Sequence, residues 1–436
     1  MFDKKNLIHR VKLLSEELNG KQIERESEIS LLIITFFARK NLFFLGEPGV
    51  SKTGLLKIFS TILEDGKVFD WTIKNDTKYE ELFGDRYEDD SGKMIYDTSD
   101  SIVDSHITIL DEVWKGNSKI LNSLLSAMSD YRVVEIRGRG VIKIPNLSTL
   151  GASNELPSDV SLKALKDRFT VMMKVVPIKD DDNWIKFISR DYDRVPILQN
   201  KFKLVELEYI YRESLKIKIS SSLYQVMLKI KNKIKSLKIS CSDRRFDGTV
   251  EILKVSAFLN NRKEVDITDI FLMIHMVWEI ETDIKKIKDL IFEIIFGNMD
   301  EVKKSIIKNN EDFLKQQSIK NGVLNDFLKF RFTFEHSSNA EFNFNINSVI
   351  NLINNFKTIL IGYQSIGNHF KESTYLEQLI RKHLFLPNFT NKIYEIIDIN
   401  DVYIYSIELE KEIKYLEKWM VDNKHMYLYN SKVIKN

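Results

Sequence analysis

The sequence is poor in cysteine, proline and glycine. Among 436 residues there are six prolines, 16 glycines and a single cysteine, Cys241. One cysteine excludes an intrachain disulfide framework and any zinc site built from cysteines. This usage is typical of a reducing compartment, so we expect a cytoplasmic protein.

The chain also lacks an excess of one charge and a long apolar run. Its 65 lysines and arginines nearly balance 63 aspartates and glutamates, for a net charge of +2, which argues against a histone-like nucleic-acid binder. The most apolar stretch, residues 29–38, is much shorter than the roughly 20 apolar residues of a membrane-spanning helix. We therefore expect no membrane span. Hydrophobic residues make up 43% of the chain, which excludes global disorder.

Strand and helix patterns alternate in the first part of the chain. A short apolar run predicts a strand at residues 41–45, and further strand candidates lie at residues 68–73, 107–110, 147–152 and 171–176. Helical periodicity occupies residues 3–38, 52–63 and 120–128. Such alternation favours a mostly parallel sheet with helices on both faces. We therefore predict an α/β domain over residues 1–182.

The pattern changes after this domain. Residues 183–289 show helical periods without strand signals, which predicts an all-helical domain. In residues 290–436, phenylalanines alternate with polar residues at 330–335 and 342–346, on either side of a polar turn. This alternation predicts a β-hairpin, and residues 402–409 predict a further strand. We therefore expect a C-terminal α+β module, helical with a small β element.

A glycine-containing loop joins the first predicted strand to a helix, as phosphate-binding loops do. It fits the pattern G-x-x-x-x-G-K-[ST] except that Ser51 replaces the last glycine. Backbone N–H groups of such a loop and the helix N-terminus bind phosphate oxygens. A tight turn with a solvated lysine is the alternative. The residues predicted to bind ATP are Gly46, Glu47, Pro48, Gly49, Val50, Ser51, Lys52, Thr53 and Gly54.

Individual roles follow from the chemistry of this loop. We expect Gly46 and Gly49 to supply unusual φ values. Lys52 is expected to reach the β- and γ-phosphates, and Thr53 to bind Mg²⁺.

Two carboxylates end the predicted strand at residues 107–110. Asp111 is expected to bind Mg²⁺, and Glu112 to polarise the attacking water. The alternative is an acidic pair at a helix N-terminus, which is common. Because the phosphate loop precedes this pair in the chain, nucleotide hydrolysis is the favoured interpretation.

Further motifs accompany the loop at residues 46–53 and the acidic strand end at residues 109–115, and they lie at residues 120–125, 152–157, 165–169 and 242–245. In combination, these motifs resemble those of the MoxR family of AAA+ ATPases, and within it the regulatory ATPase variant (RavA-like) group. The resemblance covers roughly residues 5–285, and beyond about residue 290 it concerns architecture only. It predicts an α/β AAA+ core, an all-helical lid over residues 183–289 and a C-terminal module.

The resemblance implies roles for further residues. Asn154 would be the sensor that orients the lytic water, and Arg168 the arginine finger directed at the γ-phosphate of the next subunit. Arg244 would be the second sensor, reaching from the lid to the nucleotide, with Arg245 as a competitor. Ile23 would contact the adenine. Hairpins within residues 84–104 and 132–144 would line a central pore.

The resemblance also implies partners. We expect a ring, a hexamer, that uses ATP and Mg²⁺ to remodel or chaperone a protein client, together with a von Willebrand A-domain protein. Two alternatives stay open, namely a nucleotide-gated scaffold with little turnover and a nucleic-acid motor. The second is disfavoured, because its only signal is a lysine cluster at residues 229–238 and solvated helix faces commonly carry such clusters.

Overall fold

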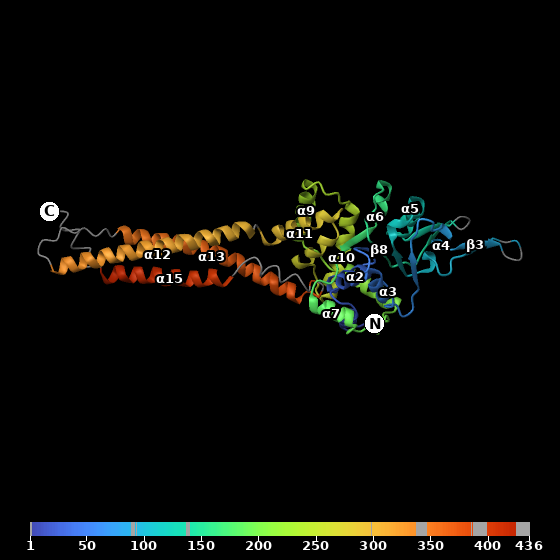
Figure 1. The fold of residues 1–436 in the computed structure, drawn as a ribbon, viewed down its shortest axis with the longest axis horizontal. Coiled ribbons are helices and arrows are strands. Elements are labelled where there is room, and N and C mark those ends of the chain that lie inside the picture. Colours follow the sequence, from blue (N-terminus) through green and yellow to red (C-terminus); the bar gives the residue numbers. More distant parts are fainter. Residues whose placement is uncertain are drawn as a thin grey trace. The chain divides into compact units, whose positions relative to one another are not determined.

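The computed structural model describes residues 2–88, 92, 94–136, 140–297, 299–336, 347–384, 386 and 399–423 (Figure 1). The chain forms two compact units. Unit 1 consists of residues 1–295 and 380–388, and unit 2 of residues 296–379 and 389–436. The finer division at residues 182 and 289 stays a prediction.

Unit 1 contains a five-stranded sheet in the order β2-β5-β8-β1-β9, and every neighbouring pair is parallel. The five predicted strands and their parallel arrangement are thereby confirmed. The central strands β1 and β8 are buried along their whole length, as expected for a parallel sheet covered on both faces. The strands are β1 (Asn41–Leu45), β2 (Val68–Thr72), β5 (Ile107–Asp111), β8 (Ser148–Ser153) and β9 (Phe169–Lys174).

The apolar stretch at residues 29–38 belongs to a buried helix. α2 (Glu26–Phe37) packs against α1 (Lys4–Lys21), against β1 and β9, and against helices that follow the sheet in the chain. Among the described residues, no helix has both the length and the apolarity that crossing a membrane requires. The other short helices around the sheet are α3 (Lys52–Ser60), α4 (Tyr79–Phe83), α5 (Ser118–Ala127) and α6 (Lys163–Lys166).

In the part of the chain that the structure describes, two β-hairpins lie outside the sheet. β3 (Asp85–Glu88) pairs with β4 (Met94–Asp97), and β6 (Val133–Ile136) pairs with β7 (Gly140–Lys143), both antiparallel. They occupy the two regions in which hairpins were expected. The β6–β7 hairpin lies between α5 and β8 in the chain, so its two ends join the sheet region directly.

The second part of unit 1 is helical. Trp278 is fully buried there and donates a hydrogen bond from Nε1 to the carbonyl oxygen of Met172 in β9, at 3.0 Å. This bond attaches the helical part to β9, the outermost strand on that side of the sheet. The helices are α7 (Asp181–Ser189), α8 (Leu204–Leu215), α9 (Ser221–Ser236), α10 (Asp243–Leu259), the 3₁₀ helix η4 (Ile267–His275) and α11 (Glu281–Phe296).

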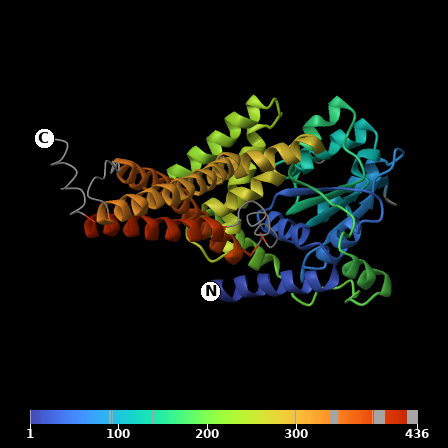
Figure 2. The same ribbon diagram turned by 60° about the vertical axis from the view of Figure 1, so that its left-hand side comes forward.

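Three long helices make up the described part of unit 2, namely α12 (Met299–His336), α13 (Asn347–Lys382) and α15 (Ile399–Asp422). They run side by side in both ribbon views (Figures 1 and 2). Their shared core includes Phe313 from α12, Phe356 from α13, and Leu409 and Leu416 from α15.

The β element predicted for the C-terminal module is wrong wherever the structure describes it. Residues 330–335 lie in α12 and residues 402–409 lie in α15. The second arm of the predicted hairpin, residues 342–346, lies outside the described residues. The buried positions Leu409, Ile413 and Leu416 are four and three residues apart, which is helical spacing. The predicted strands rested on alternation with a period of two over a few residues, and such short segments did not reveal the helical period of about 3.6 residues.

Gly151 permits close packing in the middle of the sheet. A Cβ atom at this position would lie 2.8 Å from the Phe169 ring and 3.2 Å from the Phe43 ring. These two rings contact each other, with centroids 5.4 Å apart. The ring pair therefore occupies the space that a side chain at position 151 would need.

We predict that Gly151→Ala lowers the free energy of unfolding by about 1–3 kcal/mol, because the added methyl group overpacks this contact. Gly20→Ala is the matched control. Gly20 lies in α1 with open space around it, so alanine should stabilise the protein by about 0.5–1 kcal/mol there. Urea unfolding of both variants measures the difference, and equal effects would contradict the packing argument.

Candidate active site

The carboxyl ends of three adjacent parallel strands lie together at one end of the sheet, which we call its carboxyl edge. Leu45 of β1 is paired with Ser153 of β8, and Asp111 of β5 is paired with Ala152. The N–H of Gly46 donates to the carbonyl oxygen of Ser153 at 3.2 Å. The predicted phosphate loop and the predicted acidic pair therefore lie on the same edge, on either side of β8.

The phosphate loop has two residues in the left-handed region. Gly49 has φ 85°, as predicted, and Ser51 has φ 64° at the position where the pattern places glycine. Gly46 does not have a positive φ, so that expectation is wrong. Its glycine is needed for another reason, since a Cβ atom would lie 2.4 Å from the carbonyl oxygen of Val175.

Lys52 begins α3 and is directed back into the loop. Its Nζ donates to the carbonyl oxygens of Gly46 at 2.6 Å and Glu47 at 2.8 Å, and the residue is 8% exposed. Burial lowers the pKa of Lys52, while the negative charges of Glu112 and Asp111 oppose that shift. The ammonium group therefore lies within the electrostatic range of both predicted carboxylates.

The backbone of the acidic pair is left-handed at its second residue, Glu112. Glu112 follows β5 with φ 51°, and its N–H donates to Oδ1 of Asp111 at 3.0 Å. The hydroxyl of Ser153 donates to Oε2 of Glu112 at 3.4 Å, and Ser153 is fully buried. Asn154, the expected sensor, follows Ser153 and is exposed. Ser153 is therefore a contact of the predicted catalytic carboxylate to which the sequence analysis assigned no role, although it lies in the motif at residues 152–157.

The segment before α2 contacts the phosphate loop. Arg25 is 4% exposed and donates from Nη2 to the carbonyl oxygen of Val50 at 3.1 Å. Ile23, the expected adenine contact, is half-buried two residues earlier. Glu28, on α2, is 5% exposed, and burial raises its pKa to about 7. This buried arginine and glutamate were not predicted, because no local motif contains them.

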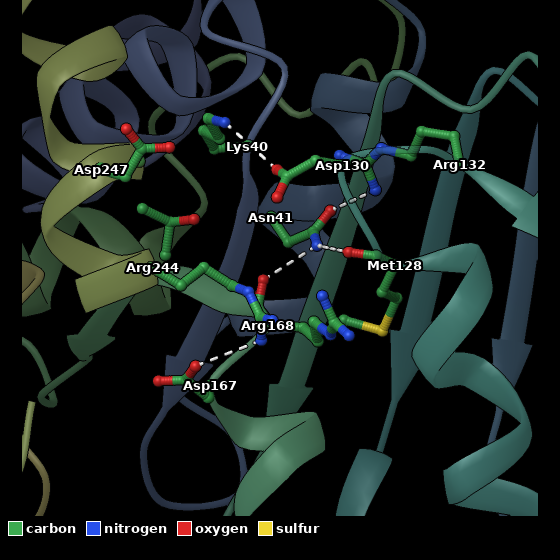
Figure 3. Close-up of a pocket in the computed structure, with 11 residues that line it drawn as sticks. Lys40, Asn41, Met128, Asp130, Arg132, Asp167, Arg168, Arg244 and Asp247 are labelled. Atoms are coloured by element: carbon green, nitrogen blue, oxygen red, sulfur yellow. Dashed lines mark hydrogen bonds and ion pairs between the residues drawn. The ribbon is translucent and has the colours of Figure 1, made fainter. Parts of the chain in front are cut away.

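Arg168 lies at the opposite edge of the sheet, where the amino ends of the parallel strands lie. It precedes β9, and its carbonyl oxygen accepts a hydrogen bond from Asn41, the first residue of β1. Figure 3 shows the pocket around it, which is lined among others by Lys40, Asp130 and Arg132. Burial lowers the pKa of Arg168, and the charge of Arg244 acts in the same direction. One strand length separates this arginine from the phosphate loop of its own chain.

The two arginines proposed as second sensor are in different environments. Arg244 is half-exposed beside Arg168, and its Nη1 lies 3.5 Å from Oδ2 of Asp167. Arg245 is 1% exposed and donates to the carbonyl oxygen of Trp278 at 2.8 Å. The structure therefore brings Arg244 to the Arg168 pocket and not to the phosphate loop of the same chain. Arg245 has a structural role inside the helical part.

Comparisons with known proteins agree with this geometry. A family model of the MoxR domain in the MoxR-vWA-beta-propeller ternary systems matches residues 9–187, and a model of the AAA lid domain matches residues 222–291. The uncharacterized protein MJ0079 of Methanocaldococcus jannaschii is 33% identical over 319 residues, which cover 72% of this chain and 82% of that protein. The chain belongs to the MoxR family of AAA+ ATPases.

Other relatives of this MoxR protein extend the comparison. The uncharacterized protein MJ0812 of the same archaeon is 32% identical over 284 residues, covering 64% of this chain and 74% of that protein. A solved structure of a candidate ATPase from Cytophaga hutchinsonii superposes with a TM-score of 0.55 at 18% identity. That match covers 68% of this chain and 96% of the other, and it concerns the fold.

Ser51 tests the conformation of the MoxR phosphate loop. We predict that Ser51→Gly raises the free energy of unfolding by on the order of 1 kcal/mol, because glycine adopts a positive φ without a Cβ penalty. The reciprocal control is Gly49→Ser, which places a side chain at φ 85° in open space and should lower stability. Chemical unfolding compares them, and a destabilised Ser51→Gly protein would refute the strain argument.

Glu28 should make stability depend on pH. Its folded-state pKa of about 7 exceeds the ordinary 4.5, so the folded protein retains a proton that the unfolded chain has lost between these values. Stability should therefore fall as pH rises through this window. Glu28→Gln should abolish that fall and stabilise the protein at pH 8 by on the order of 1–3 kcal/mol. Urea unfolding between pH 5 and 8 measures it, with Glu26→Gln on the same helix as the control that keeps the fall.

Proposed function

We propose that this chain hydrolyses ATP with Mg²⁺ in a ring of identical subunits, and that the cycle remodels or chaperones a protein client. One observation carries the proposal. Lys52, Asp111 and Glu112 are at one edge of the sheet, whereas Arg168 is at the other. A site that uses all four residues requires a second copy of the chain.

The residues at the carboxyl edge suit the nucleotide. Backbone N–H groups of residues 46–54 and the N-terminus of α3 would bind the phosphates, and Lys52 would exchange its two carbonyl acceptors for phosphate oxygens. Thr53 and Asp111 offer hydroxyl and carboxylate oxygens, the ligand type that Mg²⁺ prefers. When bound, this ion neutralises charge on the phosphates. Ile23 would contact the adenine, because its neighbour Arg25 touches the loop.

Glu112 is the group that would activate water. Its carboxylate would orient the attacking water and accept its proton, and Ser153 would hold that carboxylate. Asn154, next to Ser153 at the end of β8, would orient the same water.

Arg168 of the neighbouring subunit would complete the site. A fixed guanidinium stabilises the charge that spreads over the transferring phosphoryl group. Because Arg244 lies in the same pocket, we propose that it too acts on the neighbour's nucleotide. The expected role of Arg244 as second sensor stays a prediction, and its place in this pocket favours the neighbour's nucleotide as its target.

The proposed partners follow from the family. The matching model is named for MoxR-vWA-beta-propeller systems, which supports a von Willebrand A-domain protein as partner. We propose a ring of six subunits whose hairpins β3–β4 and β6–β7 line the pore. Membership of the RavA-like group stays a prediction, since the described part of unit 2 is helical.

Glu112→Gln tests the catalytic assignment. The variant should bind ATP and assemble, yet lose steady-state hydrolysis by about 100-fold or more, because glutamine cannot accept a proton. Glu16→Gln on the exposed face of α1 is the control and should keep full activity. Undiminished hydrolysis in Glu112→Gln would refute the assignment.

Two results with the unmodified protein would favour the alternatives. ATP binding without turnover, with and without a partner, would favour the nucleotide-gated scaffold. Hydrolysis that nucleic acid stimulates and salt suppresses would favour the nucleic-acid motor.

A further inference from the structure

Asn41 is the centre of the hydrogen bonds around Arg168. Its Nδ2 donates to the carbonyl oxygens of Arg168 at 2.9 Å and Met128 at 3.1 Å. Its Oδ1 accepts from Nη1 of Arg132 at 2.8 Å (Figure 3). The same oxygen also accepts from the N–H of Thr149 at 3.0 Å. Two acceptors face the amide nitrogen and two donors face the amide oxygen, so the orientation of the side chain is determined. Asn41 is 3% exposed.

Arg132 connects this centre to the β6–β7 hairpin. It immediately precedes β6, and its carbonyl oxygen accepts from the N–H of Ile144, just after β7, at 2.8 Å. Its guanidinium donates to Asn41 and also to the carbonyl oxygens of Arg39 at 2.9 Å and Leu147 at 3.3 Å. The base of the hairpin is therefore two direct hydrogen bonds from the backbone of Arg168.

The Arg168 side chain itself is prepared for another contact. Among the described residues, its buried Nε has no hydrogen-bond partner. The backbone of its turn, in contrast, is fixed by Asn41. The hydrogen bond from Asn41 therefore fixes the turn, while Nε of the guanidinium stays unpaired.

We propose that Asn41 and Arg132 are positioning residues that present Arg168 to the neighbouring subunit and couple its turn to the β6–β7 hairpin. The inference rests on the proposed function, because only a site completed by a second copy needs Arg168 to be presented outward. All the Asn41 side-chain contacts lie at the edge opposite the phosphate loop. The nucleotide site of the same chain should therefore be unaffected by their loss.

Asn41→Ala separates positioning from binding. Alone, it should lower kcat by about tenfold to 100-fold, as a misplaced catalytic group does, with KM for ATP changed less than about twofold. The matched control is Asn146→Ala. Asn146 is likewise a buried asparagine at this edge, two residues before β8, but it donates to Thr108 and not to Arg168. Its kcat should stay within about twofold of the parent.

Co-assembly with Glu112→Gln subunits is the decisive measurement. Glu112→Gln subunits have a defective site of their own but an intact Arg168, whereas Asn41→Ala subunits have the reverse. In a random one-to-one mixture, about a quarter of the head-to-tail sites combine two intact halves, so hydrolysis should recover. A mixture of Arg168→Ala with Glu112→Gln is the reference.

The two proposals fail differently. If the reference recovers and the Asn41→Ala mixture does not, the positioning inference is overturned while the shared site stands. If neither recovers, the shared site is overturned, and the inference with it.

Arg132→Lys is the second variant and protects against misfolding of Asn41→Ala. A lysine can keep one bond to Asn41 but not the bonds to Arg39 and Leu147 together. We expect a smaller loss of kcat, recovered by the same mixing. An unchanged kcat would overturn the part played by the hairpin.

Discussion

The proposed site depends on the insertion of β1 between β8 and β9 in parallel register. β1 is five residues long and buried throughout, and it pairs with a strand on each side. Its carboxyl end continues into the phosphate loop, and its amino end carries Asn41. Since a strand advances about 3.3 Å per residue, these ends are roughly 15 Å apart. The buried strand β1 therefore holds the predicted nucleotide-binding residues at a fixed distance from Arg168.

This separation has a consequence for assembly. Arg168 and the predicted nucleotide-binding residues lie at opposite edges of one sheet. Each subunit would therefore receive an arginine from one neighbour at its carboxyl edge and supply Arg168 to another neighbour from the opposite edge. Such a contact is heterologous, and repeated rotation closes it into a ring or continues it into a filament. The Arg168 pocket is lined in part by the exposed side chains of Asp130 and Arg244, which suits a surface that is accessible before assembly.

Local sequence patterns correctly predicted the five strands of the sheet and the turn that joins β1 to α3, because these signals are short. β1 and β5, for example, are largely apolar runs that end at Gly46 and Asp111. The C-terminal β element was predicted incorrectly because its signal was equally short. The Leu409 and Leu416 spacing shows that the packing of α15 against its neighbours decides the conformation there. Alternation over a few residues cannot be distinguished from a helix that continues in both directions.

Long-range contacts account for the site residues that the motifs missed. Arg25 bonds to Val50 across 25 positions, and Asn41 bonds to Arg168 across 127. Neither pair forms a recognisable motif, because the fold alone brings the partners together. The placement of Arg244 was missed for the same reason. Its motif identified an arginine at the start of α10 but not the edge of the sheet that α10 faces.

Asn41 nevertheless left a signal in the sequence, as the only polar residue of a strand that is otherwise leucine and phenylalanine. A leucine there would leave two buried N–H donors and two carbonyl acceptors unpaired, at about 1–3 kcal/mol for each group. An aspartate would satisfy the two donors but place a negative oxygen against the carbonyls of Met128 and Arg168. An amide meets both demands at once. Because two of its four bonds lead to Arg132 and Arg168, the requirement for asparagine links the stability of the strand to the geometry of the arginine turn.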